Sequence, residues 1–218
     1  MPDEYKDRKV FFLAGPIRGG GGWQMEAAES LWANHPGCIV ADPSRWDVAE
    51  KMAKNDEERK KITEHRKNSF GIKDDVLYPH QAGWESDHME VASKKGMLIF
   101  WLEKESKTEA RPQGEGVYAQ DTRVEIGMWL ERIKNNPNLN VKIGGHWEID
   151  EKEKETKNSF GGMNFITYYL TGEKDRRKIY DGKINNEHLV LAKNLEKFLE
   201  KALPSEITEM KIPKMPIK

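Results

Sequence analysis

The sequence predicts an α/β fold in which helices cover both faces of a parallel sheet. Short apolar runs of strand length alternate along the chain with longer stretches of helical periodicity. The runs are apolar at nearly every position, as expected for strands buried on both faces, and the first two end at Gly-Pro and Asp-Pro pairs. Strands that alternate with helices pair in parallel, so we expect a doubly wound sheet of about five strands.

The apolar runs locate the strands. Lys9–Ala14 (KVFFLA) is the first expected strand and Cys38–Ala41 the second. Met97–Leu102 (MLIFWL) is the most hydrophobic, and Val141–Gly144 is the fourth. The apolar and aromatic run Met163–Leu170 fits either a helix or a fifth strand.

Helical periodicity fills the intervals, with helices expected over Trp23–Asn34, 47–68, Trp84–Lys95, Gln120–Lys134 and Asn185–Leu203. We expect a single domain over 1–218, with a core over 9–145 and an extension over 146–218 that carries the last helix and an extended tail. Loops are expected over 68–82 and 103–117, the latter long enough for a lid or a partner-facing loop, and a solvated charge run over 148–157.

Composition restricts the classes of function. The 36 basic and 37 acidic residues give a net charge of −1, so no global field attracts a nucleic-acid polymer or an anionic membrane. The single cysteine, Cys38, allows no intramolecular disulfide, and no Cys/His cluster has the spacing of metal ligands. No run has the length of a membrane span, and the charged N-terminus does not resemble a signal peptide. We expect a cytoplasmic protein without metal or cofactor.

The segment GPIRGGGG, Gly15 to Gly22, follows the first expected strand. Glycines there let the backbone approach a ligand, and the helix that follows offers free amide groups to an anion or hydroxyl. Arg18 adds a charged donor. The spacing matches neither the dinucleotide fingerprint nor a P-loop, and a flexible connection is the ordinary alternative. Asp42, after the second strand, should reach the same edge of the sheet.

Three carboxylates are candidates for chemistry. Glu125 lies in or just past the first turn of its helix, where an acidic residue ordinarily stabilises the helix dipole. The dipole and the nearby Arg123 should favour the ionised form of Glu125. Glu85 and Asp87 precede the most hydrophobic strand and could line a cleft, although a solvated helix face is the commoner explanation for such residues.

Five segments taken together resemble the nucleoside 2-deoxyribosyltransferase family, in the family's order and over roughly residues 9–145. They are FLAGPIRGGGGWQ at Phe12–Gln24, ADPSRW at Ala41–Trp46, GWESDHM at Gly83–Met89, GMLIFWL at Gly96–Leu102 and YAQDTRVEIGMW at Tyr118–Trp129.

The resemblance implies a flavodoxin-like fold, a homo-oligomer with shared active sites, and nucleosides and free nucleobases as ligands. Glu125, in Glu-Ile-Gly, would be the nucleophile that attacks the sugar. Many relatives carry an aspartate where this chain has Lys95-Gly96, so Glu85 and Asp87 are the expected substitutes that serve the leaving base. The substrate-binding residues would be Gly15, Pro16, Ile17, Arg18 and Gly19 on the 5′ side of the sugar, with Trp23, Gln24, Asp42 and Arg123 near the ligand.

Breaking an N-glycosidic bond builds positive charge on the sugar, which a carboxylate stabilises and then traps. The resemblance therefore predicts exchange of nucleobases on 2′-deoxyribonucleosides. One alternative is an N-glycosidase for nucleoside 5′-monophosphates, because nucleotide hydrolases of the same superfamily use a Ser-Ile-Arg-Gly-Gly loop that resembles residues 16–20. Another is a non-catalytic nucleotide-binding or sensor module.

Overall fold

The structure is a computed structural model, and it describes residues 7–44, 53, 55–68, 81–107, 111, 116–150, 155–158, 163–172 and 186–203. Of the loop expected over 68–82, residues 69–80 lie outside the described residues, while Asn68 ends one helix and Gln81 begins the next. The start of the expected helix over 47–68 and the extended tail also lie outside the described residues.

A parallel sheet forms the centre of the molecule, in the order β2-β1-β3-β4-β6, and β5 pairs antiparallel with the far end of β4. Counted over the parallel strands alone, this is the order 2-1-3-4-5 of a flavodoxin-like fold. The expected α/β fold is therefore confirmed. The strands are β1 Val10–Ala14, β2 Ile39–Ala41, β3 Gly96–Leu102, β4 Val141–Asp150, β5 Glu155–Asn158 and β6 Leu189–Ala192.

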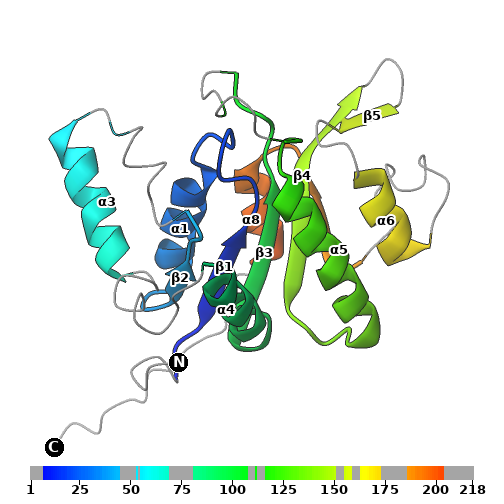
Figure 1. The fold of residues 1–218 in the computed structure, drawn as a ribbon, viewed down its shortest axis with the longest axis horizontal. Helices are drawn as coiled ribbons and strands as arrows, with labels where there is room; N and C mark the ends of the chain where they lie inside the picture. Colours follow the sequence, from blue (N-terminus) through cyan, green and yellow to red (C-terminus); the bar gives the residue numbers. More distant parts are fainter. Residues whose placement is uncertain are drawn as a thin grey trace, which may run out of the picture.

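Helices cover both faces of the sheet. Helices α4 and α5 lie in front of the sheet in Figure 1 and α8 lies behind it, while α3 stands beside α1, to which the ion pair Lys61–Glu29 links it. On the far side, α6 packs beside α5, and the Tyr169 hydroxyl donates to Glu131 over 2.5 Å. The helices are α1 Trp23–Asn34, α3 Asp56–Asn68, α4 Gln81–Lys95, α5 Gln120–Asn135, α6 Met163–Thr171 and α8 Leu195–Ala202.

The alternating directions of the side chains along each strand divide the core into two layers. Phe12 and Phe100 point toward α4 and α5, where Trp84 and Trp129 are buried. Leu13 and Trp101 point to the opposite face, which α1 and α8 cover. Successive side chains of a strand point to opposite faces, so a strand that is apolar throughout requires helices on both sides.

Helix α8 packs tightly against β4 through Phe198. This ring is fully buried, and its centroid lies 5.1 Å from that of Trp101. A Cβ added at Gly144 would lie 2.3 Å from Cδ2 of Phe198, so only glycine leaves room for the ring. The close approach of α8 to the sheet therefore depends on Gly144.

The C-terminal part of the chain differs from the expected pattern. The single helix expected over Asn185–Leu203 is instead strand β6 followed by α8, because Asn194 ends the strand and caps the helix by accepting from the Lys197 amide over 3.0 Å. The run at 163–170 is helix α6, and β6 is the last parallel strand. The charged run over 148–157 pairs as the β4–β5 hairpin where it is described. The sheet is thus completed by residues of the expected extension.

Helix α5 buries one apolar face and leaves two apolar side chains exposed. Ile126, Trp129 and Ile133 are buried, whereas Val124 and Met128 are each 59% exposed. Among the described residues, no helix is long and apolar enough to cross a membrane.

Replacing Phe198 with alanine should lower the free energy of unfolding by about 3–5 kcal/mol, because it leaves a cavity between α8 and the sheet. Chemical denaturation measures this loss. Glu196→Ala, at an exposed position of the same helix, is the control and should change the free energy by less than about 0.5 kcal/mol. A loss below about 1 kcal/mol in Phe198→Ala would show that α8 is not essential to the core.

Candidate active site

Two loops meet at the carboxyl edge of the sheet, between β1 and β3. The chain leaves β1 for α1 on one face and leaves β3 for α5 on the other, so the strand order reverses at this point. Such a switch point opens a crevice in which open α/β sheets bind their ligands. The glycine loop 15–22 and the segment 103–119 lie on its two sides, as described for residues 103–107, 111 and 116–119.

The glycine loop is fixed from within the protein. A Cβ at Gly15 would lie 2.4 Å from the Trp101 carbonyl oxygen, and one at Gly20 would lie 2.2 Å from the Pro16 carbonyl oxygen. Trp23 Nε1 donates to the same Pro16 oxygen over 3.1 Å, and Gln24 Nε2 does so over 3.3 Å. Both side chains are buried, with 4% and 2% exposed. The loop is therefore a preorganised element rather than a flexible connection, and Trp23 and Gln24 support it from inside.

The second loop contacts the first directly. The amide of Ser106 donates to the Gly19 carbonyl over 2.7 Å. Gly19 has φ +73°, and a Cβ there would lie 3.1 Å from Cγ of Arg111 and 3.5 Å from the Tyr118 ring. Tyr118 donates its hydroxyl to the Glu103 carbonyl over 2.9 Å, which ties the end of the loop to its beginning. Where it is described, the expected long loop thus packs against the glycine loop.

Glu125 is the most perturbed carboxyl group near this edge. Its side chain is half-buried in the second turn of α5, just past the first turn as expected. Burial, followed by the nearby negative charges of Glu85 and Asp121, raises the pKa of Glu125 to about 7. The expectation that the helix N-terminus and Arg123 would favour the ionised form is wrong, because desolvation and two like charges outweigh them.

The charge of Glu85 acts on Glu125 because α4 and α5 run side by side. Each helix precedes or follows a strand of the same parallel sheet, so both begin at its carboxyl edge, and Glu90 of α4 pairs with Arg132 of α5 farther along. Glu85 is half-buried near the start of α4, whereas Asp87 is exposed. Among the described residues, no interaction joins Asp87 to Glu125. The carboxyl pair of this site is Glu125 and Glu85.

Helix α4 is anchored beside Glu85 by Trp84. The Trp84 ring is buried, stacks on His88 with centroids 4.3 Å apart, and lies 5.9 Å from the Phe12 ring. His88 Nδ1 lies 2.7 Å from the Trp84 carbonyl oxygen one turn earlier. Packing against the sheet thus fixes the position from which Glu85 approaches Glu125.

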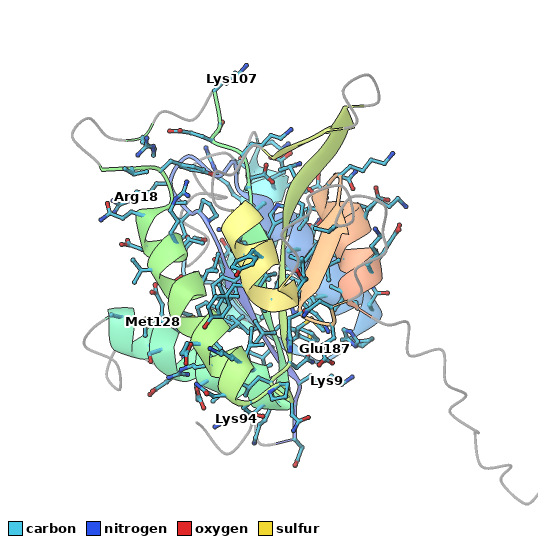
Figure 2. The ribbon with its side chains drawn as sticks, turned by 90° about the vertical axis from the view of Figure 1, so that its right-hand side faces the viewer. Lys9, Arg18, Lys94, Lys107, Met128 and Glu187 are labelled. Carbon is cyan, nitrogen blue, oxygen red and sulfur yellow. The ribbon has the colours of Figure 1, made fainter. Side chains whose placement is uncertain are left out.

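The other side chains that the sequence suggested for ligand binding, Asp42, Arg123 and Arg18, lie in different surroundings. Asp42 is 1% exposed, and it accepts from the Ser44 amide over 2.9 Å and from the Ser44 hydroxyl over 2.5 Å, so it stabilises the turn after β2. Arg123 is half-buried and donates to the Tyr118 carbonyl over 3.3 Å. Arg18 is exposed on the glycine loop, at the upper end of the molecule in Figure 2.

A polar pair that the sequence did not single out joins the residue directly after β3 to the middle of β4. Glu103 accepts from Trp101 Nε1 and from the Lys104 amide, each over 2.8 Å, and it also contacts His146 Nε2. Burial raises the pKa of Glu103, but the hydrogen bonds from His146 and Trp101 outweigh burial and hold it below its usual value. The signal in the sequence was weak: Glu103 directly follows the expected strand Met97–Leu102, and His146 lies two residues past the expected strand Val141–Gly144.

Among the described residues, no group of three or more His, Cys, Asp or Glu side chains could hold a metal ion. No protein-family model, curated protein or solved structure matches the chain. The arrangement itself supplies a carboxyl group that changes ionisation near neutral pH, a second carboxylate beside it, and a rigid loop that presents backbone amides and carbonyls.

Replacing Glu85 with glutamine should bring the pKa of Glu125 down from about 7. The substitution removes the neighbouring negative charge that raises this pKa more than Asp121 does. NMR titration of the side-chain carboxyl carbon of Glu125 measures the shift. Asp87→Asn changes the same charge at an exposed position two residues away and is the control. Equal shifts in both variants would contradict the pairing of Glu85 with Glu125.

Proposed function

We propose that the chain is a nucleoside 2-deoxyribosyltransferase that exchanges nucleobases on 2′-deoxyribonucleosides. The observation that carries the proposal is the carboxyl pair: Glu85 lies close enough to Glu125 to raise its pKa, at the edge where a parallel sheet binds ligands. The resemblance of the glycine loop and of the segment around Glu125 to the transferase family suggests the same reaction.

The first half-reaction would use both carboxyl groups. A carboxylate oxygen of Glu125 forms a bond to C1′ of the sugar while the bond from C1′ to the base nitrogen breaks. The electron pair of the broken bond stays on the base, which accepts a proton from Glu85. General acid assistance of this kind contributes about 10² to 10⁴ in rate.

The second half-reaction would decide between transfer and hydrolysis. A nitrogen of the incoming base attacks C1′, the ester oxygen of Glu125 leaves as carboxylate, and Glu85 takes the proton that the incoming base loses. Water in place of the base would give the free sugar. A pKa near 7 leaves about half of Glu125 ionised at neutral pH, which supplies the carboxylate form that attacks C1′.

The glycine loop would hold the sugar. Trp23 and Gln24 both donate to the Pro16 carbonyl, so their contribution is to fix the loop, and Arg18 is the exposed charged side chain of the loop that suits contact with a ligand. Asp42 would act in the same indirect way, through the turn that it forms with Ser44.

An N-glycosidase for nucleoside 5′-monophosphates is the second candidate. Arg18 is exposed on the glycine loop, and the aliphatic part of Arg111 covers Gly19 in the same loop. The Arg111 guanidinium itself pairs with Glu105 over 2.6 Å and donates to the Gly116 carbonyl over 2.7 Å, so Arg18 is the guanidinium group of the glycine loop that favours a phosphate over a hydroxyl on the 5′ side. A requirement for the 5′-phosphate in turnover would favour this candidate over the transferase.

A homo-oligomer with shared active sites remains part of the proposal. Val124 and Met128 are each 59% exposed on the α5 helix that carries Glu125, and Val117 before the helix is 69% exposed. These apolar side chains favour contact with another copy of the chain near the carboxyl pair.

Incubation with 2′-deoxyinosine and free adenine should yield deoxyadenosine, and Glu125→Ala should abolish it, because no carboxylate then traps the sugar. Chromatography of the nucleosides measures the exchange, and a parallel incubation with deoxynucleoside monophosphates tests the hydrolase.

Asp87→Asn is the control variant and should keep the activity within about threefold, whereas Glu85→Gln should lose about 10² or more. Free base released only from the phosphorylated substrates would replace the transferase by the N-glycosidase. A protein that binds nucleotides equally well with Ala at position 125 and turns over no substrate would be a binding or sensor module.

A further inference from the structure

A cavity lies at the opposite edge of the sheet from the candidate active site. Its volume is about 500 Å³, within the usual range for small-molecule sites. The C-terminal half of α5, the end of α6 and the turn before β6 enclose it. Its lining includes buried Leu130, Ile133 and His188 as the floor, and exposed Lys134 and Glu187 at the rim.

The cavity is separate from the carboxyl pair. Lys134 lies nine residues after Glu125 on α5, which corresponds to about 13 Å along the helix. Figure 2 places Glu187 toward the end of the molecule that also carries Lys9 and Lys94, and Arg18 at the other end. The cavity is therefore a separate site, whatever reaction the carboxyl pair performs.

His188 is a rigid part of the cavity floor. Its Nδ1 lies 3.0 Å from the Val141 carbonyl oxygen, its amide donates to Asn186 Oδ1 over 2.9 Å, and its carbonyl accepts from the Ile143 amide over 2.7 Å. A carbonyl oxygen only accepts, so Nδ1 carries the hydrogen and the neutral ring presents a lone pair at Nε2.

Nε2 of His188 is buried and has no hydrogen-bond partner among the described residues. Oε1 of Glu187 lies 3.6 Å from this nitrogen, which is beyond hydrogen-bond distance, and this oxygen is also an acceptor of hydrogen bonds. Two neighbouring acceptors cannot satisfy each other. A ligand that brings two adjacent N–H donors would satisfy both, and the exposed Glu187 side chain is able to rotate to admit it.

The wall above this floor suits an aromatic ring. Tyr169 is half-buried, and the Lys134 ammonium lies 5.7 Å from the centroid of its ring. The Tyr169 hydroxyl is held by Glu131, and Leu130 and Ile133 provide apolar surface beneath. A flat ring would stack on Tyr169 and bury its other surface against these side chains.

We propose that this cavity binds a planar bicyclic heteroaromatic molecule that carries a ring N–H and an adjacent amino group. The two donors bond to Nε2 of His188 and to the carboxylate of Glu187, and the ring packs between Tyr169 and the apolar floor.

Binding of 2-aminobenzimidazole and of 2-methylbenzothiazole tests the proposal, because the two probes have similar shapes and only the first has N–H donors. NMR titration of the unmodified full chain should show saturable shifts of the His188 and Tyr169 resonances, with at least about tenfold tighter binding of 2-aminobenzimidazole. His188→Phe keeps a ring of similar size but removes one of the two acceptors, so it should weaken 2-aminobenzimidazole several-fold and leave 2-methylbenzothiazole unchanged.

His35→Phe, at a half-buried histidine outside the cavity, is the control and should preserve the tenfold difference. If His188→Phe does not fold, Glu187→Gln at the exposed rim should weaken 2-aminobenzimidazole several-fold and leave 2-methylbenzothiazole unchanged. Equal affinities of the two probes, or no saturable shift at millimolar concentrations, would overturn the proposal.

Discussion

The burial of both faces of β1 and β3 is the constraint on which the rest of the structure depends. Every residue of Val10–Ala14 is at most 2% exposed, and Leu98–Leu102 is fully buried. Strands buried on both sides need helices on both sides, and parallel pairing makes each connecting helix run back across the sheet. The loops that lead into these helices therefore collect at one edge, where β1 and β3 send their chains to opposite faces.

The same constraint brings two acidic side chains together, which makes it less favourable for both to be ionised. Glu85 and Glu125 belong to neighbouring helices that both start at the carboxyl edge, and burial makes their charges harder to hold. The folded-state pKa of Glu125 lies above its ordinary value of 4.5, so the folded protein binds this proton more tightly than the unfolded chain does. This contribution to stability is complete below about pH 4.5 and is lost as the pH rises through about 7. A costly arrangement of this kind is characteristic of functional sites.

Strand and helix identities in the first two thirds of the chain could be predicted because apolar periodicity and turn residues agreed with burial. Helix α1 was expected with its observed bounds, and the convergence of the glycine loop with the Glu125 helix followed from the parallel order. The β6–α8 junction could not be predicted, because the capping role of Asn194 depends on where the sheet stops. The expectation that Glu125 is ionised was wrong for a related reason. Burial and the charge of Glu85 are effects of the tertiary structure, whereas the helix dipole is a local effect. The contact of Glu103 with His146 likewise joins residues 43 positions apart.

Whether Glu125 is the group that carries the sugar is tested most directly by mass spectrometry of the protein quenched with acid during turnover of a 2′-deoxyribonucleoside. Proteolytic mapping of the quenched protein should find one deoxyribosyl group, esterified to Glu125, and the adduct should accumulate when no acceptor base is present. An adduct on Glu85 instead would exchange the roles of the two carboxyl groups. Turnover without any covalent adduct on either residue would contradict the account.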